Sequence, residues 1–375
     1  MPTERRGLML LVSALLAIAS LGFMALHLRD AALTADGQRY QEMALSFLHT
    51  GEFHTDRMTM AFPQEGESEN GYTHYFSPLW PVVQAGFYAA FGALGFWLAL
   101  MTCCALALVA AWWFTRDLFG GTLAAVAVGF TGYYLDRIIV QRSAEPLALV
   151  FFLAMMWAIQ RSLKPGRGKW ILLAGGAAGL AYLTRSSIGW LFIAGGAAGF
   201  AWRVYFHRRD AVNRYYLGAI ALFGVCYALW AGRNLALFWD GTLAGFPAAV
   251  SADAVFQHKF AVAMGQPLRF LALFPFKVLW AGYLLWPVWL LRHHSLLYQL
   301  RNLRDEQQSG LFLSWAVPFV LGCFAGTVAT LGDTNPPPVL FNYDNLRYFL
   351  FAMPGLVWSP RALDAAHDTP APQRL

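Results

Sequence analysis

Charged residues are scarce in this chain of 375 residues: they make up 13% of it, while hydrophobic residues make up 58%. A soluble globular protein, in which about a quarter of the residues are charged, is therefore excluded. Several apolar runs reach or approach the ~20 residues that a helix needs to cross the hydrocarbon core of a bilayer. The composition predicts an all-α, polytopic membrane protein.

Common catalytic and metal-binding motifs are missing as well. The sequence contains no P-loop, no G-x-S-x-G and no H-E-x-x-H, the signatures of NTPases, α/β-hydrolases and zinc peptidases. Its cysteines all lie inside apolar runs without C-x-x-C spacing, so we expect neither structural disulfides nor a cysteine metal site. The net charge of +6 is distributed over short loops rather than one basic patch, so nucleic acid is not an expected partner.

The apolar runs predict about ten transmembrane helices with both termini in the cytoplasm. The first run, 7–26, follows two arginines and has no small-residue cleavage site, so we expect it to stay as the first span. The run 79–114 is too long for one helix and too short for two. We expect 79–94 to be re-entrant or to lie along the interface, because every basic loop then falls inside except 136–142, which leaves two arginines outside. The further expected spans are 96–114, 119–135, 145–160, 170–184, 188–205, 215–238, 268–291, 311–331 and 347–358, followed by a cytoplasmic tail at 361–375.

Residues 27–78 form the longest polar interval, which this topology places on the outer face as the first loop. Its first half predicts an amphipathic helix that begins at Asp36 and lies in the membrane interface. The apolar residues of this helix recur at helical spacing: Tyr40, Met43, Ala44, Phe47 and Leu48. Gly51 is typical of the position just past a helix C-terminus.

Polar residues at the expected outer ends of the helices are the candidates for chemistry. Asp36 is either the helix N-cap or a functional carboxylate, and Glu145, which precedes a proline at the start of a span, has the same two interpretations. Arg185, Arg233 and Arg347 run against the positive-inside bias, so we expect carboxylates or a phosphate to compensate them. For Arg185, which closes an expected span, simple pairing with the negative end of the helix dipole is the competing explanation.

Two repeated glycine motifs, at 174–181 and 194–201, each contain G-x-x-x-G. We interpret Gly175 with Gly179, and Gly195 with Gly199, as sites of close helix packing without a further function.

An acidic cluster in the first loop, formed by Glu65, Glu67 and Glu69, leaves a divalent-cation site open, although a solvated acidic loop is the simpler interpretation.

Taken in order, several of these landmarks resemble the GT-C superfamily of integral-membrane glycosyltransferases, such as protein O-mannosyltransferases and the aminoarabinose transferase that acts on lipid A. The matching pieces are Asp36 with Tyr40, S-P-L-W-P at 77–81, Glu145 with Pro146, G-L-A-Y-L-T-R at 179–185, Arg233 with Asn234, and R-Y-F-L-F-A-M-P at 347–354. The resemblance covers most of the chain and implies one transferase domain at 1–360, whose catalytic loop is the interval 27–78.

The resemblance implies an inverting transfer of a hexosyl or pentosyl group from a polyprenyl-phosphate donor to a hydroxyl acceptor. Asp36 is then the general base, and Glu145 is a second acid in the same cavity. The residues expected to contact substrate are Tyr40, His74, Arg185, Arg233, Asn234, Arg347 and Tyr348. No cofactor is implied, and a divalent metal stays an open alternative.

Two departures leave the acceptor open among lipid, glycan and protein. No second acid adjoins Asp36, and no large soluble outer domain follows the spans. The expected location is the bacterial inner membrane, with the active site on the periplasmic face. A lipid-linked glycan ligase or polymerase is one alternative function. A transporter or flippase of a lipid-linked sugar is another, although it predicts paired repeats with ionisable residues at mid-membrane, which this sequence does not show.

Overall fold

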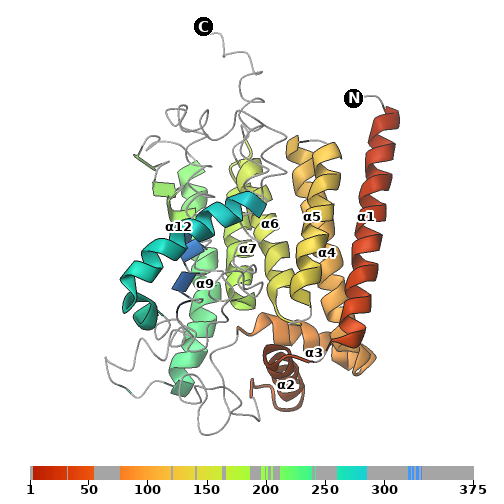
Figure 1. Cartoon of the computed structure of the whole chain (residues 1–375). Helices are drawn as coiled ribbons and strands as arrows, with labels where there is room; N and C mark the ends of the chain where they lie inside the picture. Colours follow the sequence, from red (N-terminus) through yellow and green to blue (C-terminus); the bar gives the residue numbers. More distant parts are fainter. Residues whose placement is uncertain are drawn as a thin grey trace.

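The structure, a computed structural model, describes residues 3–54 apart from 32, 77–162 apart from 120, 140 and 141, 166–185, 212–238 and 260–284, with isolated positions within 196–205, at 241 and within 320–331. These regions are mostly helical, as the sequence predicts. The helices are α1 (Thr3–Asp30), α2 (Ala35–Thr50), α3 (Leu79–Phe91), α4 (Leu94–Phe119), α5 (Gly121–Ile139), α6 (Glu145–Ser162), α7 (Trp170–Thr184), α9 (Val212–Phe238) and α12 (Pro267–Leu284) (Figure 1).

Among the described residues, three helices are long and apolar enough to cross a membrane. The spans are Gly7–Arg29 in α1, Leu94–Arg116 in α4 and Arg214–Leu237 in α9. Shorter apolar stretches form α7 and most of α6. These helices mark a membrane protein. The total of about ten spans stays a prediction, because the expected spans 188–205, 311–331 and 347–358 lie wholly or largely outside the described residues.

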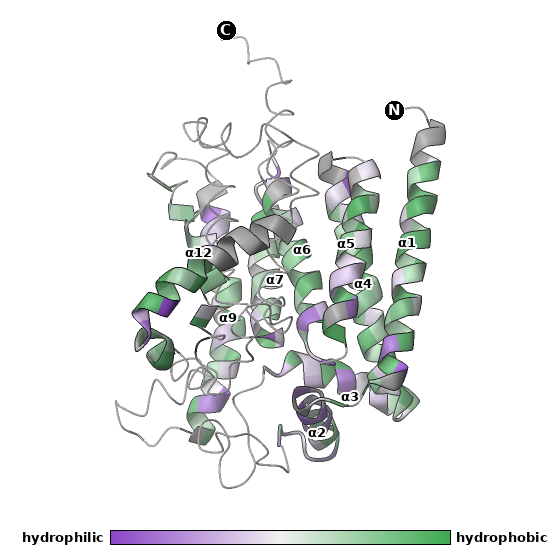
Figure 2. Ribbon diagram, in the orientation of Figure 1, coloured by the Kyte–Doolittle hydropathy of each residue, from purple (hydrophilic) through white to green (hydrophobic). Residues whose placement is uncertain are grey.

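The outward faces of α1 and α9 are apolar. Ile18 of α1 and Leu229 of α9 are 66% and 68% exposed. Figure 2 shows hydrophobic residues along the middle of the long helices, whereas hydrophilic residues gather on α2 and near the lower ends of α5, α6 and α9. Exposed apolar surface of this extent is stable against lipid tails rather than against water.

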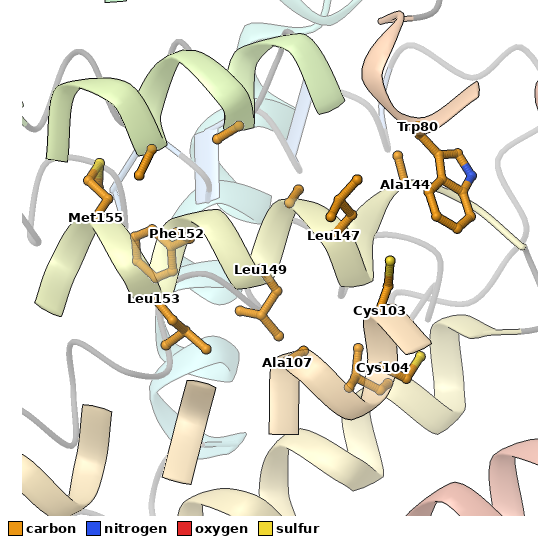
Figure 3. Close-up of a cluster of buried hydrophobic side chains, with 14 of the residues drawn as sticks. Trp80, Cys103, Cys104, Ala107, Ala144, Leu147, Leu149, Phe152, Leu153 and Met155 are labelled. Atoms are coloured by element: carbon orange, nitrogen blue, oxygen red, sulfur yellow. The ribbon is translucent and has the colours of Figure 1, made fainter. Parts of the chain in front are cut away.

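Helix α6 lies at the centre of the described core. It packs against α4 on one side and α7 on the other. Its Phe152 and Met156 have almost no exposed surface. Figure 3 shows Leu149 of α6 directed toward Ala107 and Cys104 of α4. A helix that is apolar on nearly all sides is expected in such a central place.

Helix α3 corresponds to the segment 79–94 that the sequence predicts to be re-entrant or interfacial. Its 13 residues extend about 20 Å, which is less than the ~30 Å thickness of a hydrocarbon core. The chain then turns at Gly92, and α4 begins at Leu94. Figure 1 shows α3 lying across the lower end of the bundle rather than along α4. This arrangement agrees with the interfacial interpretation.

Helix α2 packs on α3 with the apolar face that the sequence predicts. Tyr40, Met43 and Ala44 are buried, whereas Leu48, expected on the same face, is 39% exposed because it lies in the last turn. Gly51 ends the helix as predicted: its φ is 78° and its N–H donates to the carbonyl of Phe47 at 2.9 Å. Part of the first loop is therefore held against the bundle.

The glycine motif of α7 packs this helix against α9, which confirms the packing interpretation for Gly175 and Gly179. A Cβ atom on Gly175 would overlap the backbone of Ala219, and one on Gly179 would lie 2.6 Å from Sγ of Cys226. The second motif lies largely outside the described residues, so its packing stays a prediction.

Candidate functional site

Contacts between helices bring several helix ends together at one end of the bundle. His27, near the C-terminus of α1, hydrogen-bonds Asp136, near the C-terminus of α5, at 2.8 Å. The C-termini of α1 and α5 therefore lie at the same end. Helices α7 and α9 run parallel as well, because Gly175 lies against Ala219 and Gly179, one turn later, lies against Cys226. Figure 1 shows the resulting end beside α2 and α3. We call it the α2 end; it comprises α2, α3 and the helix ends at Asp30, Ile139, Glu145, Thr184 and Phe238.

The structure places most of the predicted site residues at the α2 end. These are Asp36, Tyr40, Glu145, Arg185, Arg233 and Asn234. His74, Arg347 and Tyr348 lie outside the described residues, as do the remainder of the loop after residue 54 and the tail 361–375. The common location agrees with the predicted topology, in which all of these residues share one face of the membrane.

Asp36 is not the N-cap of α2, which corrects one of its two predicted interpretations. The cap is Thr34, whose extended backbone precedes the helix and whose Oγ1 accepts a hydrogen bond from the N–H of Gly37 at 3.2 Å. The helix therefore begins at Ala35, and Asp36 lies in its first turn with a partly buried side chain. A carboxylate in this position is stabilised by the positive end of the helix dipole.

Glu145 and Arg185 form a buried ion pair between the start of α6 and the end of α7. Nη1 of Arg185 donates to Oε1 of Glu145; the Glu145 side chain has no exposed surface, and that of Arg185 is 15% exposed. Each group also lies at the helix end that suits its charge, since Glu145 is in the first turn of α6 and Arg185 directly follows α7. An internal carboxylate thus compensates this arginine.

Arg233 of α9 contacts the segment that follows α2. Its Nη2 lies 3.3 Å from Oε2 of Glu52, and its Nη1 donates to Oδ1 of Asn234 at 3.2 Å. The guanidinium carbon lies 4.8 Å from the ring centre of Trp230 and 5.7 Å from that of Phe53. The Arg233 and Glu52 side chains are 17% and 43% exposed. Two aromatic rings therefore hold a cation whose carboxylate partner is open to solvent.

Tyr40 and Asn234, both predicted to bind substrate, are buried. Tyr40 belongs to the core cluster at 3% exposure, and Asn234 has no exposed surface. The ring of Tyr40 packs with the core, whereas Asn234 accepts the hydrogen bond from Arg233. Asn234 thus helps to orient the side chain of Arg233.

Arg142 explains how the α2 end accommodates one arginine that breaks the positive-inside pattern. Its Nη2 donates to the carbonyls of Leu28 at 3.3 Å and Ala31 at 3.2 Å, at the C-terminus of α1. The negative end of a helix dipole favours a cation at this position. A helix terminus therefore compensates Arg142 in place of a carboxylate.

The described residues contain no group of three or more His, Cys, Asp or Glu side chains that could hold a metal ion. The one acidic cluster that the sequence singles out, Glu65 with Glu67 and Glu69, lies outside the described part of the chain. A metal site in that loop stays an open expectation.

Sequence reasoning missed Glu52 and Trp230 as partners of Arg233. Glu52 follows the predicted helix end at Gly51, so its location near the membrane boundary could be predicted from the sequence. Its partner lies 181 positions away, and no local pattern reports a pairing over that separation.

No family model matches this sequence, and no curated protein matches it either. Two solved structures share its fold. One is the archaeal oligosaccharyltransferase AglB from Archaeoglobus fulgidus in complex with an inhibitory peptide and a dolichol-phosphate, with a TM-score of 0.55 and 12% identity over 98% of this chain and 51% of that chain. The other is an Archaeoglobus fulgidus oligosaccharyltransferase in complex with Zn and sulfate, with a TM-score of 0.51 and 15% identity over 95% of this chain and 49% of that chain.

At these identities the comparison shows the fold. The chain spans about half the length of the oligosaccharyltransferases that it matches. The shared fold extends over nearly the whole of this chain.

Proposed function

We propose that this protein transfers a sugar from a polyprenyl-phosphate donor to a hydroxyl acceptor, with inversion at the sugar. The observation that supports this proposal most strongly is the fold match, over 98% of the chain, to an oligosaccharyltransferase whose structure contains a dolichol-phosphate. The acids and arginines gathered at the α2 end support the proposal, because transfer from a phosphate needs a base for the acceptor and cations for the leaving group.

In the proposed reaction the acceptor oxygen attacks the anomeric carbon as the bond from that carbon to the phosphate oxygen breaks. Asp36 accepts the proton of the acceptor hydroxyl, and the polyprenyl phosphate leaves as an anion. A single displacement of this kind inverts the anomeric configuration. The position of Asp36 in the first turn of α2, partly buried at the edge of the bundle, suits a base that must meet an incoming acceptor.

The leaving phosphate requires positive charge rather than a proton donor. Arg185, Arg233 and Arg347 are the proposed sources, since guanidinium groups bind phosphate oxygens with two parallel hydrogen bonds. Glu145 is fully buried against Arg185. Within the proposal it therefore acts through Arg185, by fixing the direction of the guanidinium group.

The opposite end of the bundle supports an outer-face site. The cations at this end lie at helix ends and in the turn between α6 and α7; they include Arg116, Arg161, Arg167, Lys169 and Arg214. Under the positive-inside rule this end faces the cytoplasm, which puts the α2 end on the outer face. We propose the plasma membrane, the inner one in a bacterium, as the location.

The fold match favours transfer over transport, because the matched proteins are transferases. The sugar is a hexose or a pentose. The acceptor is a lipid, glycan or protein hydroxyl, and a ligase or polymerase acting on lipid-linked glycans is the same chemistry with a glycan acceptor.

The decisive experiment incubates the purified chain with radiolabelled polyprenyl-phosphate sugars and a membrane extract. We expect label to move from the polyprenyl carrier into an acceptor fraction, and we expect Asp36→Asn to prevent this movement. Translocation of intact lipid-linked sugar across vesicle membranes, without any transfer, would contradict the proposal and support the transporter. The same assay with EDTA decides whether a divalent metal is needed.

A further inference from the structure

We propose that Glu52 and the phosphate of a polyprenyl-phosphate ligand compete for the guanidinium group of Arg233, so that Glu52 occupies the phosphate position when no donor is bound. This inference rests on the proposed function and concerns the regulation of its site. It starts from the contact of Arg233 with the segment that follows α2.

Arg233 has the properties of a preorganised anion-binding group. The rings of Trp230 and Phe53 lie 4.8 and 5.7 Å from its guanidinium carbon, and Asn234, which is fully buried, accepts from its Nη1 at 3.2 Å. These contacts limit the directions in which the group can point. Its 17% exposure leaves it reachable from the α2 end.

Glu52 has the properties of an exchangeable partner. Its side chain is 43% exposed, and its Oε2 lies 3.3 Å from Nη2 of Arg233, which is long for a charge-assisted hydrogen bond. The contrast is with Glu145, which has no exposed surface and forms a buried ion pair with Arg185. Exposed ion pairs contribute little net free energy, so a phosphate that offers two oxygens can replace one carboxylate oxygen.

A second observation is that the side-chain amide of Asn234 offers a further hydrogen-bond donor beside the guanidinium group of Arg233. Nδ2 of Asn234 is buried and makes no hydrogen bond, while Oδ1 of the same amide accepts from Arg233. A buried amide N–H without an acceptor is costly, and an additional anion oxygen near Arg233 would satisfy it after a small rearrangement.

The exchange has a consequence for the catalytic loop. Glu52 follows α2 directly after Gly51, and Phe53 stacks on Phe47 of α2 with ring centres 5.0 Å apart. Release of Glu52 from Arg233 therefore loosens one attachment of the segment that carries Asp36. Donor binding at α9 and the position of the proposed base are linked through this contact.

The test measures binding of undecaprenyl phosphate, and of undecaprenol without phosphate, to the purified full chain in detergent. Because Glu52→Gln removes the competing charge, we expect it to tighten binding of the phosphate by about two- to fivefold, the range of an exposed ion pair, and to leave undecaprenol binding unchanged. Arg233→Gln should reduce the difference between the two lipids, while Arg185 and Arg347, the other proposed phosphate contacts, retain part of it. Adding Glu52→Gln to Arg233→Gln should have no further effect.

Asp136→Asn is the matched control, because it neutralises an acid at the same end whose described partner is His27. It should change phosphate binding much less than Glu52→Gln does. Binding that is equal or weaker in Glu52→Gln would show that the pair only fastens the loop, and would overturn the exchange while leaving the proposed transferase intact. A parent protein that binds both lipids equally would instead overturn the proposed donor, and the exchange with it.

Discussion

The two acids expected to carry chemistry have different surroundings. Asp36 is partly buried in the first turn of α2, and Thr34 caps that helix. Glu145 has no exposed surface and faces Arg185. A base must reach its substrate, so the surroundings favour Asp36 for proton transfer and Glu145 for holding a neighbouring cation.

Asp36→Asn is expected to lower turnover by about 10²–10⁴-fold, the usual effect of losing a positioned general base. Its effect on stability should stay near or below about 1 kcal/mol, because asparagine keeps the size and polarity of the side chain and the attraction of a charge to the helix dipole is worth about that much. Thr34→Ala is the matched control: it should lower the unfolding free energy by about 1 kcal/mol while turnover by the folded protein stays near parental. Turnover and thermal unfolding of both variants check this, and near-parental turnover in Asp36→Asn would end the assignment.

Arg185→Ala is expected to destabilise the protein by about 3–5 kcal/mol, because it leaves the carboxylate of Glu145 buried without this cation. Adding Glu145→Gln to Arg185→Ala removes the charge and should restore part of that loss. Thermal unfolding in detergent compares the two single variants with the double variant. If the losses in the double variant simply add, the two residues do not act as a pair.

At the scale of elements, close helix packing shapes the α2 end. The parallel contact of α7 with α9 through Gly175 and Gly179 brings the end of α7, with Arg185, and the end of α9, with Arg233, to the same side. A bulkier residue in that contact would separate the two arginines as well as destabilise the pair of helices.

Gly175→Ala is expected to destabilise the protein by about 1–3 kcal/mol, because its Cβ would overlap the backbone of Ala219. Gly176→Ala, one position along, should be neutral or stabilising by up to about 1 kcal/mol, since no atom lies within 4 Å of its Cβ position and alanine favours the helix. Thermal unfolding of both variants provides the comparison. Equal effects would show that α7 does not pack on α9 through Gly175.

At the scale of the whole molecule, the two ends differ in how their cations are compensated. At the α2 end, Arg185 and Arg233 have carboxylate partners and Arg142 has helix carbonyls. At the opposite end, Arg116 and Arg161 lie over tryptophan rings of their own helices, at 4.8 and 5.2 Å. The orientation itself is predicted from the basic turns at the opposite end, which the positive-inside rule places in the cytoplasm.

Single cysteines introduced at Thr50 and Arg167, in a background without the four native cysteines, should report opposite sides of the membrane. Both positions are exposed, one at the end of α2 and one in the turn before α7. An impermeant thiol reagent added to intact cells should label position 50 and leave position 167 unlabelled until the cells are opened. Labelling of position 167 from outside would reverse the proposed orientation.

Local sequence patterns are enough to predict the helices and many of the residues at which they begin and end. Helix α7 has the predicted bounds, α6 begins at the predicted Glu145, and α2 ends before the predicted Gly51, because hydrophobic runs and helix-end signals are properties of neighbouring residues. The cap of α2 was misplaced by two residues, since Thr34 and Asp36 are both favoured capping residues and only the backbone at Thr34 decides between them.

The pairing of charged side chains depends on how the helices pack in three dimensions. Arg185 pairs with Glu145 over 40 positions, and Arg233 meets Glu52 over 181. The sequence predicts that carboxylates or a phosphate compensate these arginines. Which carboxylate pairs with which arginine depends on the directions of the helices and on how closely neighbouring helices approach. Those follow from contacts such as Gly175 against α9, which are made between residues far apart in the chain and therefore leave no local pattern.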